Sequence, residues 1–167
     1  MRARRQRGGT ILEAVLFAPL LVLLLMGAVE LGRVAYTYFT LQKILYNLAR
    51  YLGTRQGVNF CDDSDATILA AKNYALTGTE DGSGDPLLPN LTADQIQIRI
   101  ERYSAETHQL DACDCSASGC DVNAGGLAPD SIVVSLAGGY PVQLRIPRLV
   151  LDPIPLRPQV RLPYGGT

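Results

Sequence analysis

The longest apolar stretch of the chain lies near its start, as an unbroken run over residues 14–29. The wider segment 11–31 has 21 residues, which as an α-helix span about 31 Å, close to the thickness of a bilayer's hydrocarbon core. The pattern therefore predicts a membrane-spanning helix. Glu13 is the exception, because a carboxylate inside an apolar helix costs about 2.5–3.5 kcal/mol at mid-membrane and less near the interface. We therefore expect a partner that neutralises Glu13.

One face of this helix stays apolar beyond residue 31. Its apolar residues recur at alternating spacings of four and three, the period of an amphipathic helix, as Val34, Tyr38, Leu41, Leu45, Leu48 and Leu52. We predict one helix from about Thr10 to Thr54, ended near Gly53 or Gly57, with its first half in lipid and its second half amphipathic. Pro19 should kink it slightly, because its ring displaces a backbone hydrogen bond.

A secretory signal peptide is the alternative explanation, since it also starts with basic residues followed by an apolar run. The sixteen apolar residues are long for such a segment, and the candidate cleavage sites after Ala28 and Ala35 each have a poor residue three positions before the cut. The helical period also continues past both sites. We therefore favour a retained span.

The remaining sequence predicts a small α+β domain. Residues 65–76 suit a short helix, capped by Asp63 or Ser64 and ended by Gly78, and residues 77–89 suit a loop. Residues 95–103 alternate strictly, which predicts a half-buried strand with isoleucines on one face and polar residues, Gln97, Arg99 and Glu101, on the other. Further strands are predicted at residues 131–137, 142–146 and 159–162, and nearby prolines limit the last of these to a short or edge strand. The fold class is α+β, a small antiparallel sheet covered by the amphipathic half of the long helix.

Charge sets the orientation of the predicted span. Four arginines precede it, Arg2, Arg4, Arg5 and Arg7, and such basic residues stay on the cytoplasmic side. The domain after the span is then exported. The chain has 15 Lys and Arg against 16 Asp and Glu, a net charge of −1. It has no basic patch interleaved with aromatic residues, so we expect no nucleic-acid partner.

The sequence offers little catalytic chemistry. His108 is the only histidine and has no evident partner in the sequence, and the chain contains no nucleophile elbow, zinc-protease helix or phosphate loop. Its acidic clusters lack the spacing of a calcium loop. We therefore expect no enzymatic activity, no cofactor and no metal site.

Four cysteines lie in the region predicted to be exported, namely Cys61, Cys113, Cys115 and Cys120. An oxidising compartment and an even count favour two disulfides. A bond between Cys113 and Cys115 would close a very small, strained ring, so Cys61 should pair with one of these two and Cys120 with the other. A tetrathiolate zinc site is the alternative, although the spacing is not that of the usual zinc knuckles. The bonds would pin the irregular loop over residues 104–129 to the helical region.

The first 55 residues also resemble a known family. A basic leader ends in Arg7-Gly8, Glu13 follows five residues after the glycine, and Pro19 follows six residues after the glutamate. The pattern continues through Glu30-Leu31-Gly32-Arg33, Leu41-Gln42 and Ala49-Arg50-Tyr51. Together these features resemble the N-terminus of the TadE-like pilus proteins, minor pilins or pseudopilins of the tight-adherence (Flp pilus) machinery. One departure is Ala14, where the family usually has phenylalanine.

The resemblance implies proteolytic processing. A membrane-embedded prepilin peptidase would cut between Gly8 and Gly9, which makes Glu13 the fifth residue of the mature chain. The new α-amine, with an ordinary pKa of about 8, would then have Glu13 as its counter-ion within the subunit or on a neighbour. The implied parts are a leader at residues 1–8, a transmembrane helix at 9–33 and a periplasmic or extracytoplasmic domain at 34–167, with an amphipathic helix to about residue 54. The implied fold is pilin-like.

The implied function is that of a minor pilin, or pseudopilin, in the assembly of a Flp or type IV-like adhesive pilus. Its partners would be the prepilin peptidase, other pilins and minor pilins, the inner-membrane pilus platform and membrane lipid. It would be a single-pass protein of the inner membrane with a cytoplasmic N-terminus and a periplasmic domain, and the extracellular pilus is a further location. Two alternatives stay open: a pseudopilin of a secretion or competence system, and a single-pass anchored periplasmic binding module that uses the cysteine-rich loop.

Overall fold

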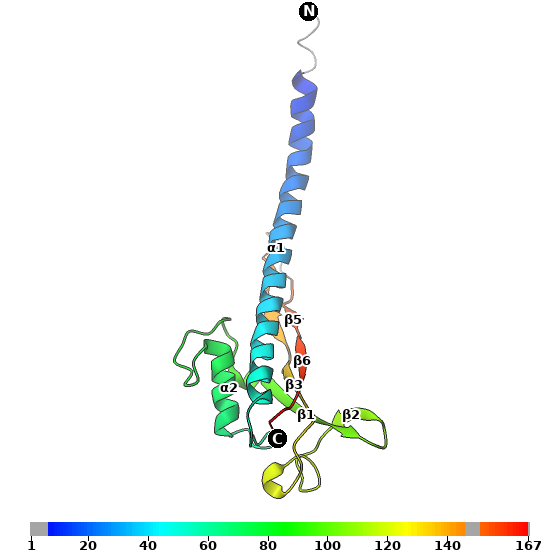
Figure 1. The fold of residues 1–167 in the computed structure, drawn as a ribbon. Helices are drawn as coiled ribbons and strands as arrows, with labels where there is room; N and C mark the ends of the chain where they lie inside the picture. The colour runs from blue at the N-terminus through cyan, green and yellow to red at the C-terminus, as the bar shows by residue number, and fades with distance from the viewer. Residues whose placement is uncertain (1–6, 146–150, 167) are drawn as a thin grey trace, which may run out of the picture.

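A single long helix and a small domain at its C-terminal end make up the molecule (Figure 1). The computed structural model describes residues 7–145 and 151–166, with side chains from Glu13 onward. Helix α1, Arg7–Gly53, has 47 residues and continues through Pro19. It starts and ends within a few residues of the predicted helix. Most of the basic leader, residues 1–6, lies outside the described residues.

The domain contains a four-stranded antiparallel sheet in the order β2-β1-β3-β6. Its strands are β1, Ile96–Ser104, β2, Gln109–Ala112, β3, Ser131–Leu136, and β6, Gln159–Pro163. In the central register Ile132 of β3 lies between Ile100 of β1 and Leu162 of β6. The strands predicted at residues 95–103, 131–137 and 159–162 are therefore confirmed as β1, β3 and β6, with small shifts at their ends.

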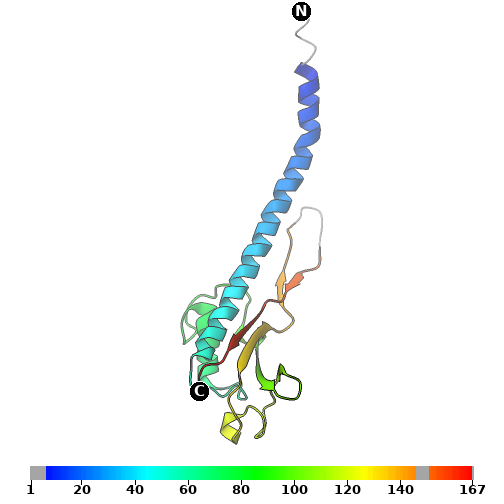
Figure 2. The same ribbon diagram turned by 45° about the vertical axis from the view of Figure 1, so that its right-hand side comes forward.

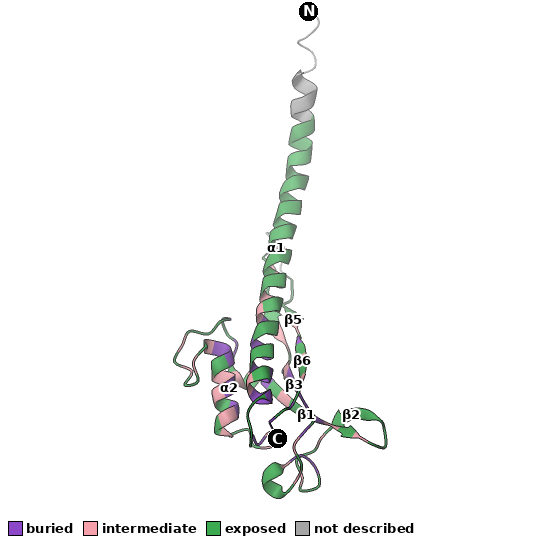
Figure 3. Cartoon of the chain, in the orientation of Figure 1, coloured by how far each residue is buried: buried purple, intermediate pink, exposed green. Residues whose placement is uncertain are grey.

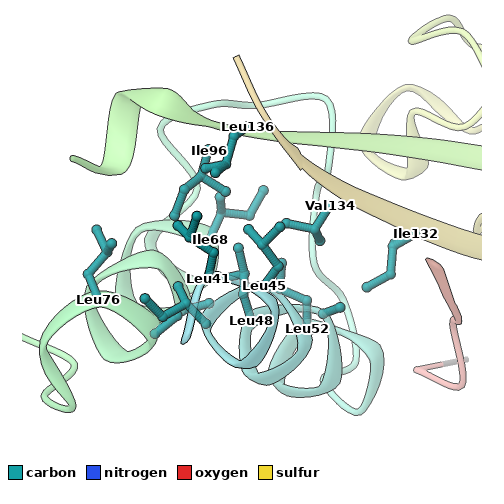
Figure 4. Packing of buried hydrophobic residues seen from close by; sticks show 14 of the residues in the cluster. Leu41, Leu45, Leu48, Leu52, Ile68, Leu76, Ile96, Ile132, Val134 and Leu136 are labelled. Atoms are coloured by element: carbon teal, nitrogen blue, oxygen red, sulfur yellow. The ribbon is translucent and has the colours of Figure 1, made fainter. Parts of the chain in front are cut away.

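The amphipathic part of α1 covers the inner face of this sheet. Leucines and isoleucines of α1 are fully buried there, with 0% exposure, and they contact apolar residues of β1, β3 and α2 in one cluster (Figure 4). Burying one such side chain contributes roughly 1.5–3 kcal/mol. The residues of α1 in the cluster are Leu41, Ile44, Leu45, Leu48, Ala49 and Leu52. The predicted α+β packing is confirmed.

The apolar stripe of α1 is buried only from Leu41 onward. Val34 is half-buried and Tyr38 remains 37% exposed, although both belong to the predicted stripe. The sheet is too short to reach them, as the change from purple to green along α1 in Figure 3 shows. The helical period was therefore predicted correctly, but the cover over its first two positions was not.

The C-terminal end of α1 is closed by the segment that follows β6. The N–H of Gly165 donates to the carbonyl oxygen of Gly53 at 3.0 Å, and the Tyr164 hydroxyl donates to the carbonyl oxygen of Arg55 at 2.9 Å. The last carbonyls of a helix have no partners within it. These two bonds supply donors from more than a hundred residues away, one to the last carbonyl of α1 and one to the segment just after it, and they fix the end of α1 to the sheet.

Helix α2, Ala66–Thr77, packs beside α1 and ends at Gly78, which has a left-handed backbone with φ of 80°. The predicted cap was wrong: Asp65, rather than Asp63 or Ser64, accepts hydrogen bonds from the N–H groups of Thr67 at 2.8 Å and Ile68 at 3.3 Å. Asp65 is the residue immediately before the first helical turn, which is the position from which a side chain reaches those donors.

Glu101 corrects the predicted polar face of β1. Its side chain is buried rather than solvated, with 9% exposure. Arg161 of β6 donates to both carboxylate oxygens at 2.9 Å, and the Ser131 hydroxyl donates at 3.2 Å. The alternation along β1 cannot show that the neighbouring part of the sheet supplies the cation of Arg161. A carboxylate that is paired with a cation can be buried, whereas burial of an unpaired carboxylate is costly.

Two strand pairs differ from the predictions. The loop over residues 104–129 was expected to be irregular, but β2 pairs with β1 as a hairpin. The strand predicted at residues 142–146 is instead β4, Tyr140–Val142, paired with β5, Ile154–Leu156, and residue 146 lies outside the described residues. Pro141 lies opposite Pro155. Proline lacks an N–H donor and is confined to edge strands, and in a two-stranded ladder both strands are edges.

Candidate functional site

The first half of α1 exposes an apolar surface that the domain does not cover. The large apolar side chains of this segment are 43–71% exposed, with Met26 at the lower limit and Leu31 at the upper. The helix over Glu13–Gly53 is long and apolar enough to cross a membrane, with a mean hydropathy of 2.4 in its most apolar window. Soluble monomers rarely expose apolar patches of this extent. This part of α1 therefore needs lipid or other apolar helices around it.

Residues of the predicted processing site lie in the first turns of this helix. Gly8 and Gly9 belong to the helical backbone of α1, directly after its first residue, Arg7. Glu13 lies little more than one turn further along, and its side chain is exposed. Within the described part of the chain, no hydrogen bond or ion pair reaches the Glu13 carboxylate. The expected counter-ion of Glu13 therefore stays a prediction.

The opposite end of the apolar run carries a second charged cluster. Arg33 donates to both oxygens of Glu30, at 2.9 and 3.2 Å. The backbone N–H of Arg145, from the segment after β4, donates to the same carboxylate at 3.2 Å. The sequence gives no sign of the contact between Arg145 and Glu30, because no local pattern links positions 115 residues apart.

Four cysteines form two disulfides in the region furthest from the start of α1. Cys61 bonds to Cys115, and Cys113 bonds to Cys120. This is one of the two arrangements that the sequence left open. The first bond joins the segment after α1 to the loop that follows β2. Cys120 is almost completely buried, with 1% exposure, and belongs to the hydrophobic core, so the loop is attached covalently and by packing.

A shallow groove runs between the solvent-facing side of α1 and the edge strand β6. It is lined by Phe39, Gln42, Lys43, Tyr46, Asn47, Gln159 and Val160. β6 pairs with β3 along one edge only. This groove continues the uncovered surface of α1 into the domain, so that surface combines the apolar segment and a more polar, aromatic segment beyond it.

Comparison with known protein families identifies the segment that carries these features. The family described as TadE-like protein matches residues 8–50, from the predicted cleavage glycine to near the end of α1. The N-terminal segment is TadE-like. Neither a curated protein nor a solved structure matches the chain significantly.

The TadE-like match covers Glu13, the apolar run, Glu30, Arg33 and the buried stripe from Leu41 to Ala49. It stops before the disulfides and the sheet. The resemblance noted in the sequence is thereby confirmed, and the TadE-like family implies association with the tight-adherence (Tad) pilus system. The single apolar helix fits a single-pass membrane anchor.

Proposed function

We propose that this protein is a minor pilin, or pseudopilin, that assists assembly of a Flp or type IV-like adhesive pilus. The observation that carries the proposal is the uncovered apolar half of the TadE-like helix, which projects from a folded domain packed on its other half (Figure 3). Such a helix can lie in lipid before assembly and against other apolar helices afterwards. In this proposal the protein is held in the inner membrane with its domain in the periplasm until it joins or primes the filament.

Processing is the first step of the proposed function. A prepilin peptidase hydrolyses the peptide bond between Gly8 and Gly9, so water adds a hydroxyl to the Gly8 carbonyl and the Gly9 amine leaves. The product starts at Gly9 and carries a new α-amine, which has an ordinary pKa of about 8 and is mostly protonated at neutral pH. Glu13 then has a cation to pair with at the membrane surface.

The Glu13 pair explains why a carboxylate is placed in a surface that other helices contact. When helices pack, an exposed carboxylate becomes buried, and a buried charge without its partner costs about 3–5 kcal/mol. A protonated amine on the same chain or a neighbour removes that cost. The pair therefore acts on association between subunits, while insertion of a single helix into lipid depends on the apolar run.

The experiment co-expresses the full chain with a prepilin peptidase and determines the N-terminus of the product by mass and sequencing. The wild-type chain should start at Gly9, and Gly8→Ala should slow cleavage. Gly27→Ala is the matched control, because it adds a methyl group to the same helix at a position with no atom within 4 Å. A mature chain that starts elsewhere, or a chain that keeps its leader under these conditions, would refute processing at Gly8.

A second variant separates processing from assembly. Glu13→Gln should still lose its leader but should co-purify poorly with other pilins, with surface filaments reduced. Glu13→Asp keeps the charge and should restore part of the association. Normal association and normal filaments in Glu13→Gln would show that Glu13 is only a residue at the membrane boundary.

A further inference from the structure

The β4–β5 hairpin reaches back along α1 to the end of its apolar run (Figure 2). Beyond its last paired residues, Val142 and Ile154, three described residues follow on each side, to Arg145 and Leu151. The hydrogen bond from the Arg145 N–H to Glu30 holds one side of the hairpin at this level. A part of the exported domain therefore lies beside the boundary between the apolar run and the charged residues.

The depth of this contact follows from helix geometry. Glu30 is the first charged residue after the apolar run over residues 14–29. At 1.5 Å per residue, Leu23 lies about 10 Å from Glu30 towards the membrane centre. One leaflet contributes about 15 Å of hydrocarbon to the bilayer. The surface between these two residues therefore lies at the depth of the outer acyl carbons of the leaflet on the exported side.

A hollow of about 360 Å³ opens at this depth, between α1 and the hairpin. Its apolar part is lined by Leu23, Met26, Gly27, Leu31 and Leu144, and its polar end by Glu30 and Arg145. Gly27 leaves space here, since a methyl group at this position would meet no atom within 4 Å. An apolar slot that ends in charged groups at the membrane surface has the same polarity as a phospholipid.

The charge of the polar end favours an anion. Arg33 already pairs with Glu30 at 2.9 Å, so Arg145 adds a positive charge beyond that pair. Among the described residues, no carboxylate lies within ion-pair distance of the Arg145 guanidinium, and its side chain is exposed. A guanidinium forms paired hydrogen bonds to phosphate oxygens, and anionic lipids attract basic residues close to the membrane surface.

We propose that this hollow binds an anionic phospholipid of the leaflet on the exported side. The Arg145 guanidinium contacts the headgroup phosphate, and one acyl chain lies between Leu144 and α1. The proposal rests on the membrane-anchored position in the proposed function. A bound lipid would fix the height of the domain above the membrane, because the hairpin and the helix would hold the same molecule.

Tryptophan fluorescence tests the site in the full chain, since the chain has no tryptophan of its own. Leu144→Trp places a reporter in the hollow, and Leu151→Trp is a second reporter that is exposed and does not disturb packing. Phe17→Trp is the reference for a tryptophan in the apolar run. Leu127→Trp is the reference for a tryptophan in water, because Leu127 lies in the cysteine-rich loop and is 70% exposed. Each variant is placed in vesicles of phosphatidylcholine and phosphatidylglycerol, with bromine on the acyl chains of one or the other lipid.

The reporter at position 144 should be quenched by brominated lipid, protected from aqueous iodide, and quenched more strongly when phosphatidylglycerol carries the bromine. Adding Arg145→Gln should reduce the preference for phosphatidylglycerol about fivefold, the effect of one basic residue near an anionic surface. Adding Arg157→Gln, which lies outside the lining of the hollow, is the matched control and should leave the preference unchanged.

Three results would overturn the lipid site. The lipid site is refuted if iodide quenches the reporters at positions 144 and 151 as strongly as the reporter at position 127. If lipid still quenches the reporter at position 17 in that case, the membrane anchor is unaffected. Quenching at 144 that weakens as the ratio of protein to lipid rises shows that a second copy fills the hollow. Equal quenching by both lipids, unchanged by Arg145→Gln, refutes the anionic headgroup. Loss of lipid quenching at position 17 would instead refute the span and the proposed function.

Discussion

The bond between Cys61 and Cys115 should contribute more stability than the bond between Cys113 and Cys120. The first bond joins residues 54 positions apart and the second joins residues seven apart. A disulfide restricts the unfolded chain more when it closes a longer loop. The Cys61→Ala and Cys115→Ala double variant is therefore expected to lose more stability than the Cys113→Ala and Cys120→Ala double variant.

The magnitudes follow from the loop lengths. Loop-closure entropy gives about 4 kcal/mol at 25 °C for the longer loop and about 2 kcal/mol for the shorter one. Neither bond shortens the loop of the other, because Cys113 and Cys120 lie on either side of Cys115. Cys120 is buried and its loss adds roughly 1 kcal/mol through lost apolar contact. The expected difference between the two double variants is therefore about 1 kcal/mol.

Urea unfolding of the full chain in detergent micelles, followed by tyrosine fluorescence, measures this difference. The denaturant slope should rise when Cys61–Cys115 is removed, because the unfolded chain expands, and should change less for the shorter loop. As a control, alkylation of the unreduced, denatured wild type should add no mass, whereas four labelled cysteines would show free thiols or a metal site. A variant without Cys61–Cys115 that is as stable as one without Cys113–Cys120 would refute the loop-length reasoning.

Two further predictions concern the caps and the alkaline limit of stability. Asp65→Ala removes the acceptor at the start of α2 and should lower the free energy of unfolding by about 1 kcal/mol. The control Asp62→Ala removes only an exposed contact to Ser64 and should change the free energy of unfolding by less than about 0.5 kcal/mol. Equal losses in the two variants would show that the cap is not the cause. Burial raises the pKa of Tyr164, so the folded state favours the neutral phenol. The resulting contribution to folding stability is fully present at pH values below the ordinary pKa of about 10. It is lost as the pH rises through the pKa of the folded state. Tyr164→Phe should therefore lose roughly 1 kcal/mol near neutral pH, for the bond to Arg55, yet show a smaller further loss above about pH 10 in unfolding experiments; an unchanged alkaline loss would show that another group causes it.

The features that could be predicted from the sequence are those that depend on residues close together in the chain. The period of Leu41, Leu45 and Leu48 reports a helix face directly, and the alternation of Ile96 and Ile100 reports a strand face, because each pattern follows from backbone geometry alone. Processing and the pairing of Glu13 with the new amine are implied by the family resemblance of the N-terminal residues, but they depend on other molecules and stay predictions.

What could not be predicted depends on which distant segments meet. Glu101 looked solvated because Arg161 lies 60 residues away, and Glu30 showed no sign that Arg145 would donate to it. The choice between Cys113 and Cys115 as the partner of Cys61 depends on the turn after β2, a strand with four exposed residues and no alternation. In each case, the contact depends on how two distant segments lie against each other, and the pattern within either segment alone does not show it.

The closure of α1 by a distant segment has a consequence for how the protein is made. Arg55 and Tyr164 are 109 residues apart, and ribosomes add about 5–20 residues per second. The residues that fix the end of α1 are therefore synthesised roughly 5–20 s after the helix itself. Contacts this distant in sequence also slow folding itself. During that interval the leucines of α1 are exposed and can aggregate, so a chaperone that holds an amphipathic helix should raise the yield of the folded protein more than one that acts on the finished sheet.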